Sequence, residues 1–468
     1  MNRLFAVSAG PQVPAPGAFV MSLISFAEKV CPPILRPTFD RIGGSALGRK
    51  VASGAFWSVL GGGLARGLGF LSMLLVARIL GKELFGEFGL VRSTATTFIA
   101  FSGFGMGVTV TKYIAELLQK ERERVGRIIG LSYLFTFLTS LFVAGVFYLA
   151  VPWLCETQLQ APHLIGVMKL GAVMLFLSTM ASTQGCVMQG FQDFRGLAIA
   201  SIAGNLVMVP LYVAGAWYGG VRGVMVCALL AIGINIAVNS IMIYRNTKRL
   251  QVRYSFYSSY KELPILWRSN LPVFLSAVVY AIGIWLSQMM LATSPNGRAE
   301  LGIYFVALNY QTIMLFLTQQ MQPVFFPMLS ELAGRKEERQ YWRVVWKGGL
   351  LNIAVSVVGT MPFLAFPAFF MGLSGEEYVG GGSALVVAAV VVWVAIFPTT
   401  CYQILISRGL NWTQAVISFI GIVLFLAAVW CFLRLIGGAA ALFCAHIVSG
   451  LCYFTLSAFT LAIVKVKS

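Results

Sequence analysis

One arginine, Arg66, stands in the middle of the first long apolar segment of this 468-residue chain. It lies about 18 Å along a helix from Gly54, at 1.5 Å per residue. An arginine at that depth costs about 2.5–3.5 kcal/mol on insertion scales, so its side chain should face protein or water. Its neighbours one helical turn away include Gly62, Gly63 and Gly69, which leave room for a ligand or a close helix. We favour an anion-binding arginine in a central cavity; the alternative is a structural arginine bonded to backbone carbonyls.

Three more cations fall within apolar segments, toward their outer ends. Long cationic side chains near a membrane boundary can extend to the interface. For Arg78 and Arg92, substrate binding and interfacial anchoring are equal alternatives. For Lys169 the sequence favours anchoring.

A polar surface is predicted on segment 301–325. Steps of three and four residues place the following side chains on one helical face: Asn309, Thr312, Phe316, Gln319 and Gln320. Segment 271–291 adds Tyr280, Trp285 and Gln288. Amides bond sugar hydroxyls and aromatic rings stack on sugars, so we expect Asn309, Gln319, Gln320, Trp285 and Gln288 to contact substrate. Hydrogen bonding between helices is the alternative.

Acidic side chains are missing where cation coupling would need them. All sixteen Asp and Glu lie in loops, in the amino-terminal segment or at the margins of apolar segments. Proton and sodium relays usually place carboxylates inside the helix bundle. Two histidines, and eight cysteines without a CxxC pair, predict no metal site. Residues 43–50 lack the Gly-Lys-Ser/Thr end of a P-loop, so no nucleotide cofactor and no catalytic residue is predicted.

The composition indicates an all-α membrane protein. Hydrophobic residues make up 58% of the chain and charged residues only 11%, whereas a soluble domain carries roughly 25% charged residues. A spanning helix needs about 20 apolar residues. About twelve segments qualify: 54–79, 88–111, 128–151, 165–187, 196–217, 220–243, 271–291, 301–325, 348–370, 383–406, 411–433 and 437–463.

The basic residues predict the orientation of these segments. With the amino terminus inside, 26 of the 34 Lys and Arg fall in cytoplasmic segments and four on the opposite side. Cytoplasmic loops are normally enriched in Lys and Arg, so both termini are expected inside. The same distribution accounts for the net charge of +18 without a nucleic-acid partner. No outer loop exceeds roughly a dozen residues, which argues against a membrane enzyme or scaffold.

The two halves of the chain resemble each other at an offset of 215 residues. Residues 115–120 match 330–335, and residues 71–75 match 286–290. At an offset one residue longer, residues 86–88 match 302–304. Six helices plus six in the same orientation is a plan of many transporters, with the substrate site between the halves. We therefore predict a cytoplasmic amino-terminal tail (1–50), a first six-helix lobe (51–245), a cytoplasmic linker (246–270) and a second six-helix lobe (271–468).

Three short motifs resemble those of the polysaccharide-biosynthesis flippase family, the O-antigen-type translocases of the multidrug/oligosaccharidyl-lipid/polysaccharide exporter superfamily. Residues 78–88 resemble its Arg-x-Leu-Gly and Phe-Gly-x-aromatic pattern, residues 112–116 its basic-Tyr-Ile-Ala-Glu segment, and residues 189–191 its short inner turn. The similarity spans about residues 50–465. Twelve segments, not fourteen, argue against the related peptidoglycan-precursor flippases.

This resemblance implies two lobes in a V around a cationic cavity in the bacterial inner membrane. The implied substrate is a polyprenyl-pyrophosphate-linked oligosaccharide, flipped from the cytoplasmic to the periplasmic leaflet by alternating access for surface polysaccharides such as lipopolysaccharide. The implied partners are this glycan, membrane lipid and other glycan-assembly proteins. Arg66 suits the pyrophosphate. The alternative is a multidrug-type cation antiporter of the same superfamily, which calls for an acidic residue in the cavity.

Overall fold

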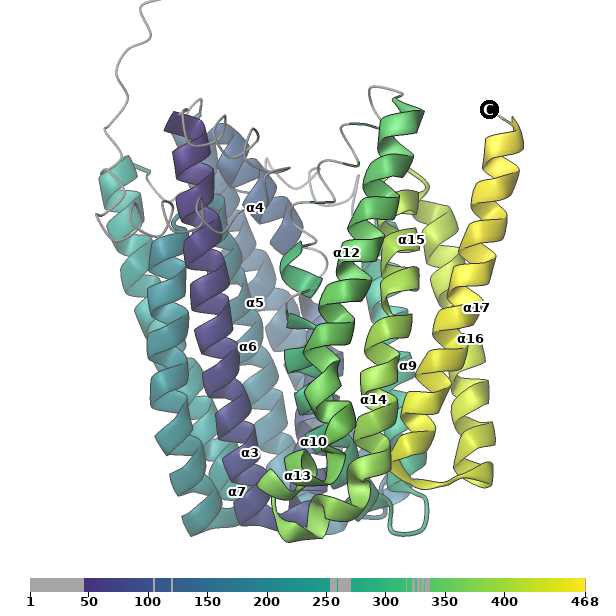
Figure 1. The fold of residues 1–468 in the computed structure, drawn as a ribbon. Coiled ribbons are helices and arrows are strands. Elements are labelled where there is room, and N and C mark those ends of the chain that lie inside the picture. The colour runs from purple at the N-terminus through teal and green to yellow at the C-terminus, as the bar shows by residue number, and fades with distance from the viewer. Residues whose placement is uncertain are drawn as a thin grey trace, which may run out of the picture.

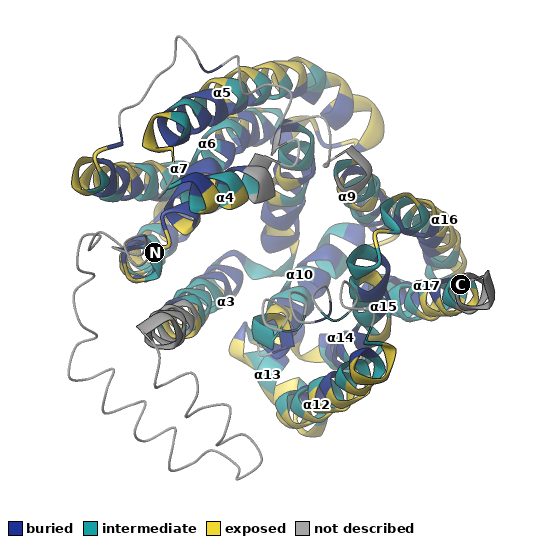
Figure 2. Ribbon diagram, turned by 90° about the horizontal axis from the view of Figure 1, so that it is seen from above, coloured by how far each residue is buried: buried dark blue, intermediate teal, exposed yellow. Residues whose placement is uncertain are grey.

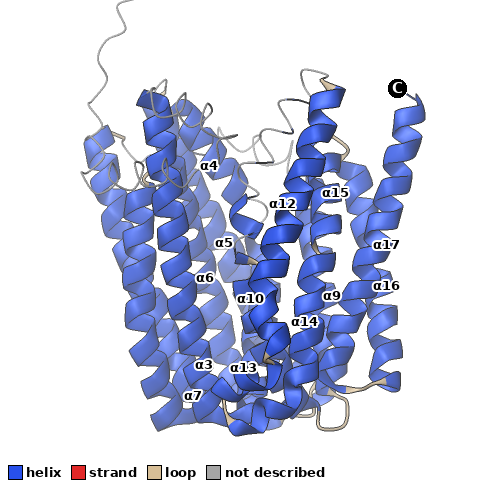
Figure 3. Ribbon diagram, in the orientation of Figure 1, coloured by secondary structure: helices blue, strands red, loops and turns tan. Residues whose placement is uncertain are grey.

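The computed structural model describes residues 46–103, 106–118, 121–252, 259, 271–316, 318–321, 325, 329, 332 and 337–467. Almost all of these residues are helical, and none of them lies in a strand. Figure 3 shows helices throughout, joined by short loops at the two ends of the molecule. Most of the predicted tail and of the predicted linker lies outside the described residues. The all-α prediction is confirmed.

The first half of the chain forms these elements: α3 (Ala46–Gly103), α4 (Met106–Leu117), α5 (Arg122–Trp153), η1 (Leu154–Gln158), η2 (Pro162–Leu164), α6 (Ile165–Gly190) and α7 (Phe194–Leu250). The second half forms α9 (Leu271–Ala292), α10 (Gly297–Met314), α12 (Glu338–Ala365), α13 (Pro367–Leu373), η4 (Glu376–Gly381), α14 (Gly382–Val394), α15 (Ile396–Ser407), α16 (Asn411–Leu435) and α17 (Gly438–Lys467).

Nine helical runs among the described residues are long and apolar enough to cross a membrane. Two of these runs, within α3 and α7, contain a glycine at which the chain reverses its direction. Each of the two runs therefore contains two of the predicted segments. Each of the twelve predicted segments lies on described helix for most of its length. The exact number of crossings stays a prediction. One boundary differs, because α7 continues to Leu250, five residues into the predicted linker.

Glycine makes both reversals. Gly81 has φ 75° and Gly220 has φ 54°, a left-handed conformation that glycine adopts without a Cβ clash. Around the first reversal, Arg92 Nη1 donates to Met73 Sδ at 3.3 Å, so the two arms of α3 lie side by side. Around the second, a Cβ built on Gly223 would lie 2.1 Å from the carbonyl oxygen of Gly215. α7 is therefore a tight helical hairpin.

The left-handed residues also repeat along the chain, and they mark the ends of helices. The described residues include ten of this kind, and eight of them form four pairs. Gly81 with Asn296 and Gln160 with Gly375 are each 215 residues apart, and Gln192 with Gly409 and Gly220 with Gly437 are each 217 apart. Helices in the two halves thus end at equivalent positions. This agreement with the offset seen in the sequence supports the proposed division into two lobes.

The helices form two groups, which we call the first lobe (α3 to α7) and the second lobe (α9 to α17), as Figure 2 shows from above. The beginning of α3 and the end of α17 lie at the same end of the molecule, here the terminal end (Figure 1). The lobes diverge toward the terminal end and come together at the opposite end. That opposite end, where α3 meets α10, is called the crossing end below.

Large apolar side chains cover much of the outer surface. Examples are Leu149, exposed to 79%, and Phe142, exposed to 71%. Such a surface suits lipid better than water. At the tip of the α7 hairpin, Trp217 and Tyr218 are exposed to 74% and 89%, and these residue types are enriched where membrane meets water. The exposed apolar belt supports a multi-pass membrane protein.

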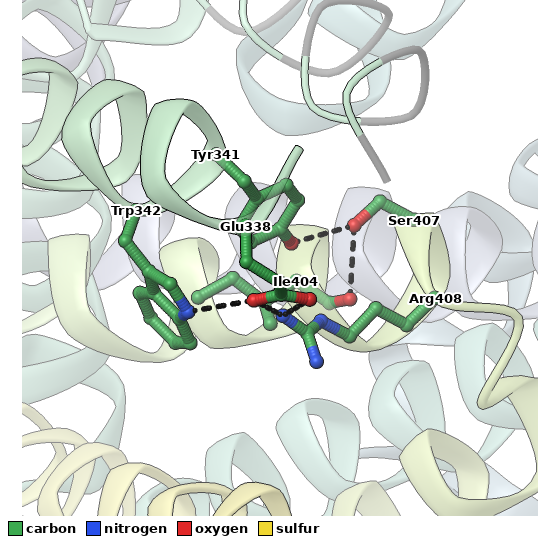
Figure 4. A network of polar contacts seen from close by, with 6 residues as sticks. All are labelled: Glu338, Tyr341, Trp342, Ile404, Ser407 and Arg408. Carbon is green, nitrogen blue, oxygen red and sulfur yellow. Dashed lines mark hydrogen bonds and ion pairs between the residues drawn. The ribbon is translucent and has the colours of Figure 1, made fainter. Parts of the chain in front are cut away.

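A polar corner joins the start of α12 to the end of α15 in the second lobe (Figure 4). One guanidinium nitrogen of Arg408 donates to both carboxylate oxygens of Glu338 at 3.0 Å. The rings of Tyr341 and Trp342 lie 5.0 and 5.6 Å from the same guanidinium. Tyr341 also bonds Ser407 at 2.9 Å. Because the cation is paired with Glu338 in this way, we interpret the corner as a structural contact within one lobe.

Candidate functional site

Arg66 lies between the lobes and contacts a residue of the opposite lobe. Its guanidinium carbon is 5.0 Å from the centre of the Phe316 ring, just beyond the end of α10. Its Nη1 atom is buried and has no hydrogen-bond partner among the residues that the structure describes. An unpaired buried donor costs about 1–3 kcal/mol, and more when it is charged. The arrangement leaves this nitrogen available to an anion.

The glycines around Arg66 divide between two helix contacts. Gly61 packs against α7 so closely that a Cβ on it would lie 2.4 Å from Ala198 Cβ. Gly63 faces the other way, where its Cβ would lie 3.3 Å from the Phe316 ring. The space beside Arg66 that the sequence predicts is therefore filled by an aromatic ring from the second lobe. Of the two uses that the sequence leaves open for these glycines, the structure shows the close helix contact.

The Arg66 contact lies well away from the crossing end. Fifteen residues separate it from the reversal at Gly81, which is about 22 Å along the first arm of α3. One turn nearer the crossing end, the Phe70 and Tyr310 rings meet edge to face at 5.0 Å. The level of Arg66 is thus inside a hydrocarbon layer about 30 Å thick.

Trp285 and Gln288, predicted from the sequence to contact substrate, bond the opposite lobe in the structure. Trp285 Nε1 donates to Thr94 Oγ1 at 3.0 Å. Gln288 is only 2% exposed, and its carbonyl oxygen accepts a bond from Ser93 Oγ. These are the interhelical bonds that the sequence left as the alternative. Their role in binding substrate stays a prediction.

The other predicted site residues are less buried. Arg92 is exposed and reaches Met73, whereas Arg78 is exposed near the first reversal. In segment 301–325, Gln319 is exposed, while Asn309 and Gln320 are partly buried. Arg66 and the predicted face of segment 301–325 therefore meet through Phe316, and the contacts of the remaining residues with substrate stay predictions.

At the crossing end, α3 and α10 touch through two glycines in a reciprocal manner. A Cβ on Gly86 would lie 2.0 Å from the Arg298 carbonyl oxygen, and a Cβ on Gly302 would lie 2.0 Å from the Lys82 carbonyl oxygen. Gly86 with Gly302, and Lys82 with Arg298, are each 216 residues apart. Equivalent residues of the two lobes thus exchange equivalent contacts, as expected across a pseudo-twofold axis.

A buried carboxylate bridges the lobes beside this crossing. Glu87, with an 8% exposed side chain, contacts Arg298 Nη1 at 3.3 Å. His163 Nε2 lies 2.8 Å from the same oxygen. Sequence reasoning missed this group because all three residues fall in predicted outer loops or at their margins. The match of 86–88 with 302–304 was the available signal, because it marks equivalent segments at the start of two helices.

Two further bonds close the crossing end. The Lys82 backbone nitrogen donates to Glu377 Oε1 at 3.2 Å, and the Tyr378 hydroxyl donates to the Ala77 carbonyl at 3.2 Å. Both acceptor–donor pairs join η4 of the second lobe to α3 of the first. Among the described residues, contacts between the lobes therefore extend from this end to the level of Arg66.

Comparisons with known proteins agree with this architecture. The EPS I polysaccharide export inner membrane protein EpsE of Ralstonia solanacearum is 24% identical over 396 residues, covering 82% of this chain and 88% of that protein. The inward-facing structure of a multidrug resistance MATE family transporter of the MOP superfamily matches with a TM-score of 0.74 at 14% identity, covering 88% of this chain and 99% of that chain. The outward-facing structure of a multidrug resistance MATE family transporter matches with a TM-score of 0.64, also at 14% identity. This match covers 90% of this chain and 97% of that chain.

At these identities the solved structures show the fold alone, which is that of a MATE-like transporter. The family model described as "Polysaccharide biosynthesis protein" matches residues 51–333, more than half of the chain. These residues contain all of the first lobe except the first five residues of α3, together with the glycine crossing and Arg66. The chain belongs to the polysaccharide biosynthesis protein family.

Proposed function

We propose that this protein is a flippase that moves a polyprenyl-pyrophosphate-linked oligosaccharide from the cytoplasmic to the periplasmic leaflet of the bacterial inner membrane. Membership of the polysaccharide biosynthesis family supports a glycan substrate. The similar protein EpsE is named a polysaccharide export inner membrane protein. The proposed activity is transport and not catalysis.

The observation that carries this proposal is the buried, unpartnered Nη1 of Arg66 between the lobes. A pyrophosphate offers several anionic oxygens, and guanidinium–phosphate bonds are charge-assisted and can be bidentate. The Phe316 ring holds the guanidinium by a cation–π contact. Such a contact is worth about 0.5–2 kcal/mol, so an anionic head group can displace it.

Alternating access is supported by the arrangement of the two lobes. They are bonded at the crossing end and diverge toward the terminal end (Figure 1). Basic segments such as 244–250 lie at the terminal end, which the positive-inside rule makes cytoplasmic. The better match to an inward-facing than to an outward-facing transporter agrees with this assignment.

The alternative, a cation antiporter, lacks a suitable carboxylate. Among the described residues, Glu87 is the only acidic residue in the buried class. It is already paired with Arg298 and His163. Transport of a cationic drug would need an acidic side chain that the drug can reach. The proposed anion at Arg66 fits the charges better.

The test compares Arg66→Ala, Arg66→Lys and a control, Lys169→Ala. Lys169 is also a cation within an apolar segment, but its Nζ packs on Tyr148, 4.9 Å from the ring centre. We expect Arg66→Ala to abolish binding of a prenyl diphosphate to the purified protein and surface glycan in cells, Arg66→Lys to keep part of both, and Lys169→Ala to keep both. Normal binding and normal glycan in a correctly inserted Arg66→Ala protein would refute the proposal.

A further inference from the structure

One oxygen of Glu87 holds two cation-forming side chains that belong to different lobes. Oε1 lies 2.8 Å from His163 Nε2 and 3.3 Å from Arg298 Nη1. The carboxylate is 8% exposed, whereas the His163 side chain is 53% exposed and so open to protons from solution. Histidine is the side chain that ordinarily changes charge between about pH 5 and 8.

The two partners of Glu87 move differently when the lobes part. His163, on η2, and Glu87, on α3, belong to the same lobe and stay together. Arg298, on α10, belongs to the other lobe and must leave. Glu87–Arg298 is therefore the bond that opposes separation, and Glu87–His163 is a bond that survives it.

The other carboxylates on the adjoining elements that the structure describes either accept hydrogen bonds from other groups or are exposed. The Glu377 carboxylate, on η4, accepts the Lys82 backbone nitrogen. Glu300, on α10, accepts the Ala439 backbone nitrogen at 2.7 Å. Glu83 on α3, Glu156 on η1 and Glu376 on η4 are exposed, and Lys82 on α3 is partly buried. Glu87 is thus the carboxylate that His163 and Arg298 share.

We propose that protonation of His163 releases the Glu87–Arg298 bridge and lets the lobes separate at the crossing end. Neutral His163 donates one hydrogen bond from Nε2 to the carboxylate, because a carboxylate only accepts. Protonated His163 adds a full positive charge at the oxygen that Arg298 also uses. The imidazolium is more stable once Arg298 has moved away, so by thermodynamic linkage added protons favour separated lobes.

This proposal needs the lobes to move, but it does not need the proposed substrate. The experiment therefore uses purified protein in lipid nanodiscs without substrate. Spin labels replace the exposed residues Tyr218, at the tip of the α7 hairpin, and Val379, on η4, in a background with the native cysteines substituted. Electron–electron resonance measures the distance between the labels at about pH 7.5 and about pH 5.5, on either side of histidine titration.

In labelled protein that keeps Glu87, His163 and Arg298, the fraction of molecules with a long distance between the two labels should rise several-fold at the lower pH. His163→Gln keeps a donor but cannot gain charge, so it should lose this pH response. Glu87→Gln should show separated lobes at both pH values, and Arg298→Gln should do the same if Glu87→Gln fails to fold. Glu83→Gln, the same charge change on an exposed residue of α3, should behave like the unmodified protein.

A pH response that survives in His163→Gln would overturn the role of the histidine. Lobes that stay together at both pH values in Glu87→Gln and Arg298→Gln would overturn the bridge itself. Neither result bears on the binding of a prenyl diphosphate at Arg66, which is measured separately.

Discussion

At the scale of the residue, the proposed function depends on the contacts that Arg66 makes. Its charge lies about 22 Å from the reversal at Gly81, at 1.5 Å per residue. The cost of that burial is offset in part by the Phe316 ring, 5.0 Å from the guanidinium carbon. The unpaired Nη1 remains. The Phe316 contact thus stabilises the guanidinium in the absence of a ligand, and the unpaired nitrogen is the atom that we propose binds one.

We predict that Phe316→Ala strengthens binding of a prenyl diphosphate about two- to fivefold. The ring face and the diphosphate compete for one guanidinium, and losing a cation–π contact of about 0.5–1 kcal/mol removes that competition. Binding can be followed by tryptophan fluorescence or by native mass spectrometry of the purified protein. Phe316→Tyr, which keeps the ring, is the matched control and should bind like the unmodified protein. Weaker binding in Phe316→Ala would mean that the ring contributes directly to the site.

At the scale of the element, the crossing of α3 and α10 is set by glycine. Gly86 and Gly302 bring a carbonyl of each helix to where the other helix would carry a Cβ. Backbone atoms cannot rotate away as a flexible side chain can. The distance between the helices, and with it the position of the Glu87–Arg298 bridge, depends on the absence of these two side chains.

We expect Gly302→Ala to destabilise the closed crossing by about 1–3 kcal/mol, the usual cost of overpacking. The measurement is thermal unfolding in detergent together with the label distance between positions 218 and 379, which should lengthen. Gly67→Ala is the control on α3, because a Cβ there meets no atom within 4 Å. That change should be neutral or mildly stabilising, since alanine is the better helix former. An unchanged distance in Gly302→Ala would show that the crossing tolerates a methyl group.

At the scale of the whole molecule, hydropathy was sufficient to predict the helices, because twenty apolar residues in lipid have few alternatives to a helix. The 215-residue offset predicted that the halves are equivalent, and the left-handed residues at 81 and 296 agree. The contact that Arg66 makes across the lobes was less predictable. Phe316 was placed on a functional face, but nothing in the sequence pairs it with a residue 250 positions earlier. Glu87 was missed because its burial depends on the other lobe packing over it.

Separation of the lobes at the crossing end should be required for export but not for binding. We predict that a thiol cross-link between Lys82→Cys and Glu377→Cys, whose native residues bond across the lobes, stops glycan export. Binding of a prenyl diphosphate should persist, because the site lies toward the other end. Cleaving the cross-link with a reductant should restore export. A thiol reagent that reacts with only one cysteine is the control. Continued export by the cross-linked protein would show that the lobes do not part there.

The aromatic tip of the α7 hairpin constrains how the first lobe sits in its bilayer. From Phe194 to the tip is 26 residues, or about 39 Å of helix, which is longer than a hydrocarbon layer of about 30 Å. Indole and phenol rings favour the headgroup region, so Trp217 and Tyr218 hold the tip at one depth. The surplus length is then accommodated by tilt or by protrusion on the opposite face. In the proposed alternating-access cycle, the first lobe would therefore tilt about this anchored tip and not shift along the membrane normal, so that the cycle would depend on the thickness of the host membrane.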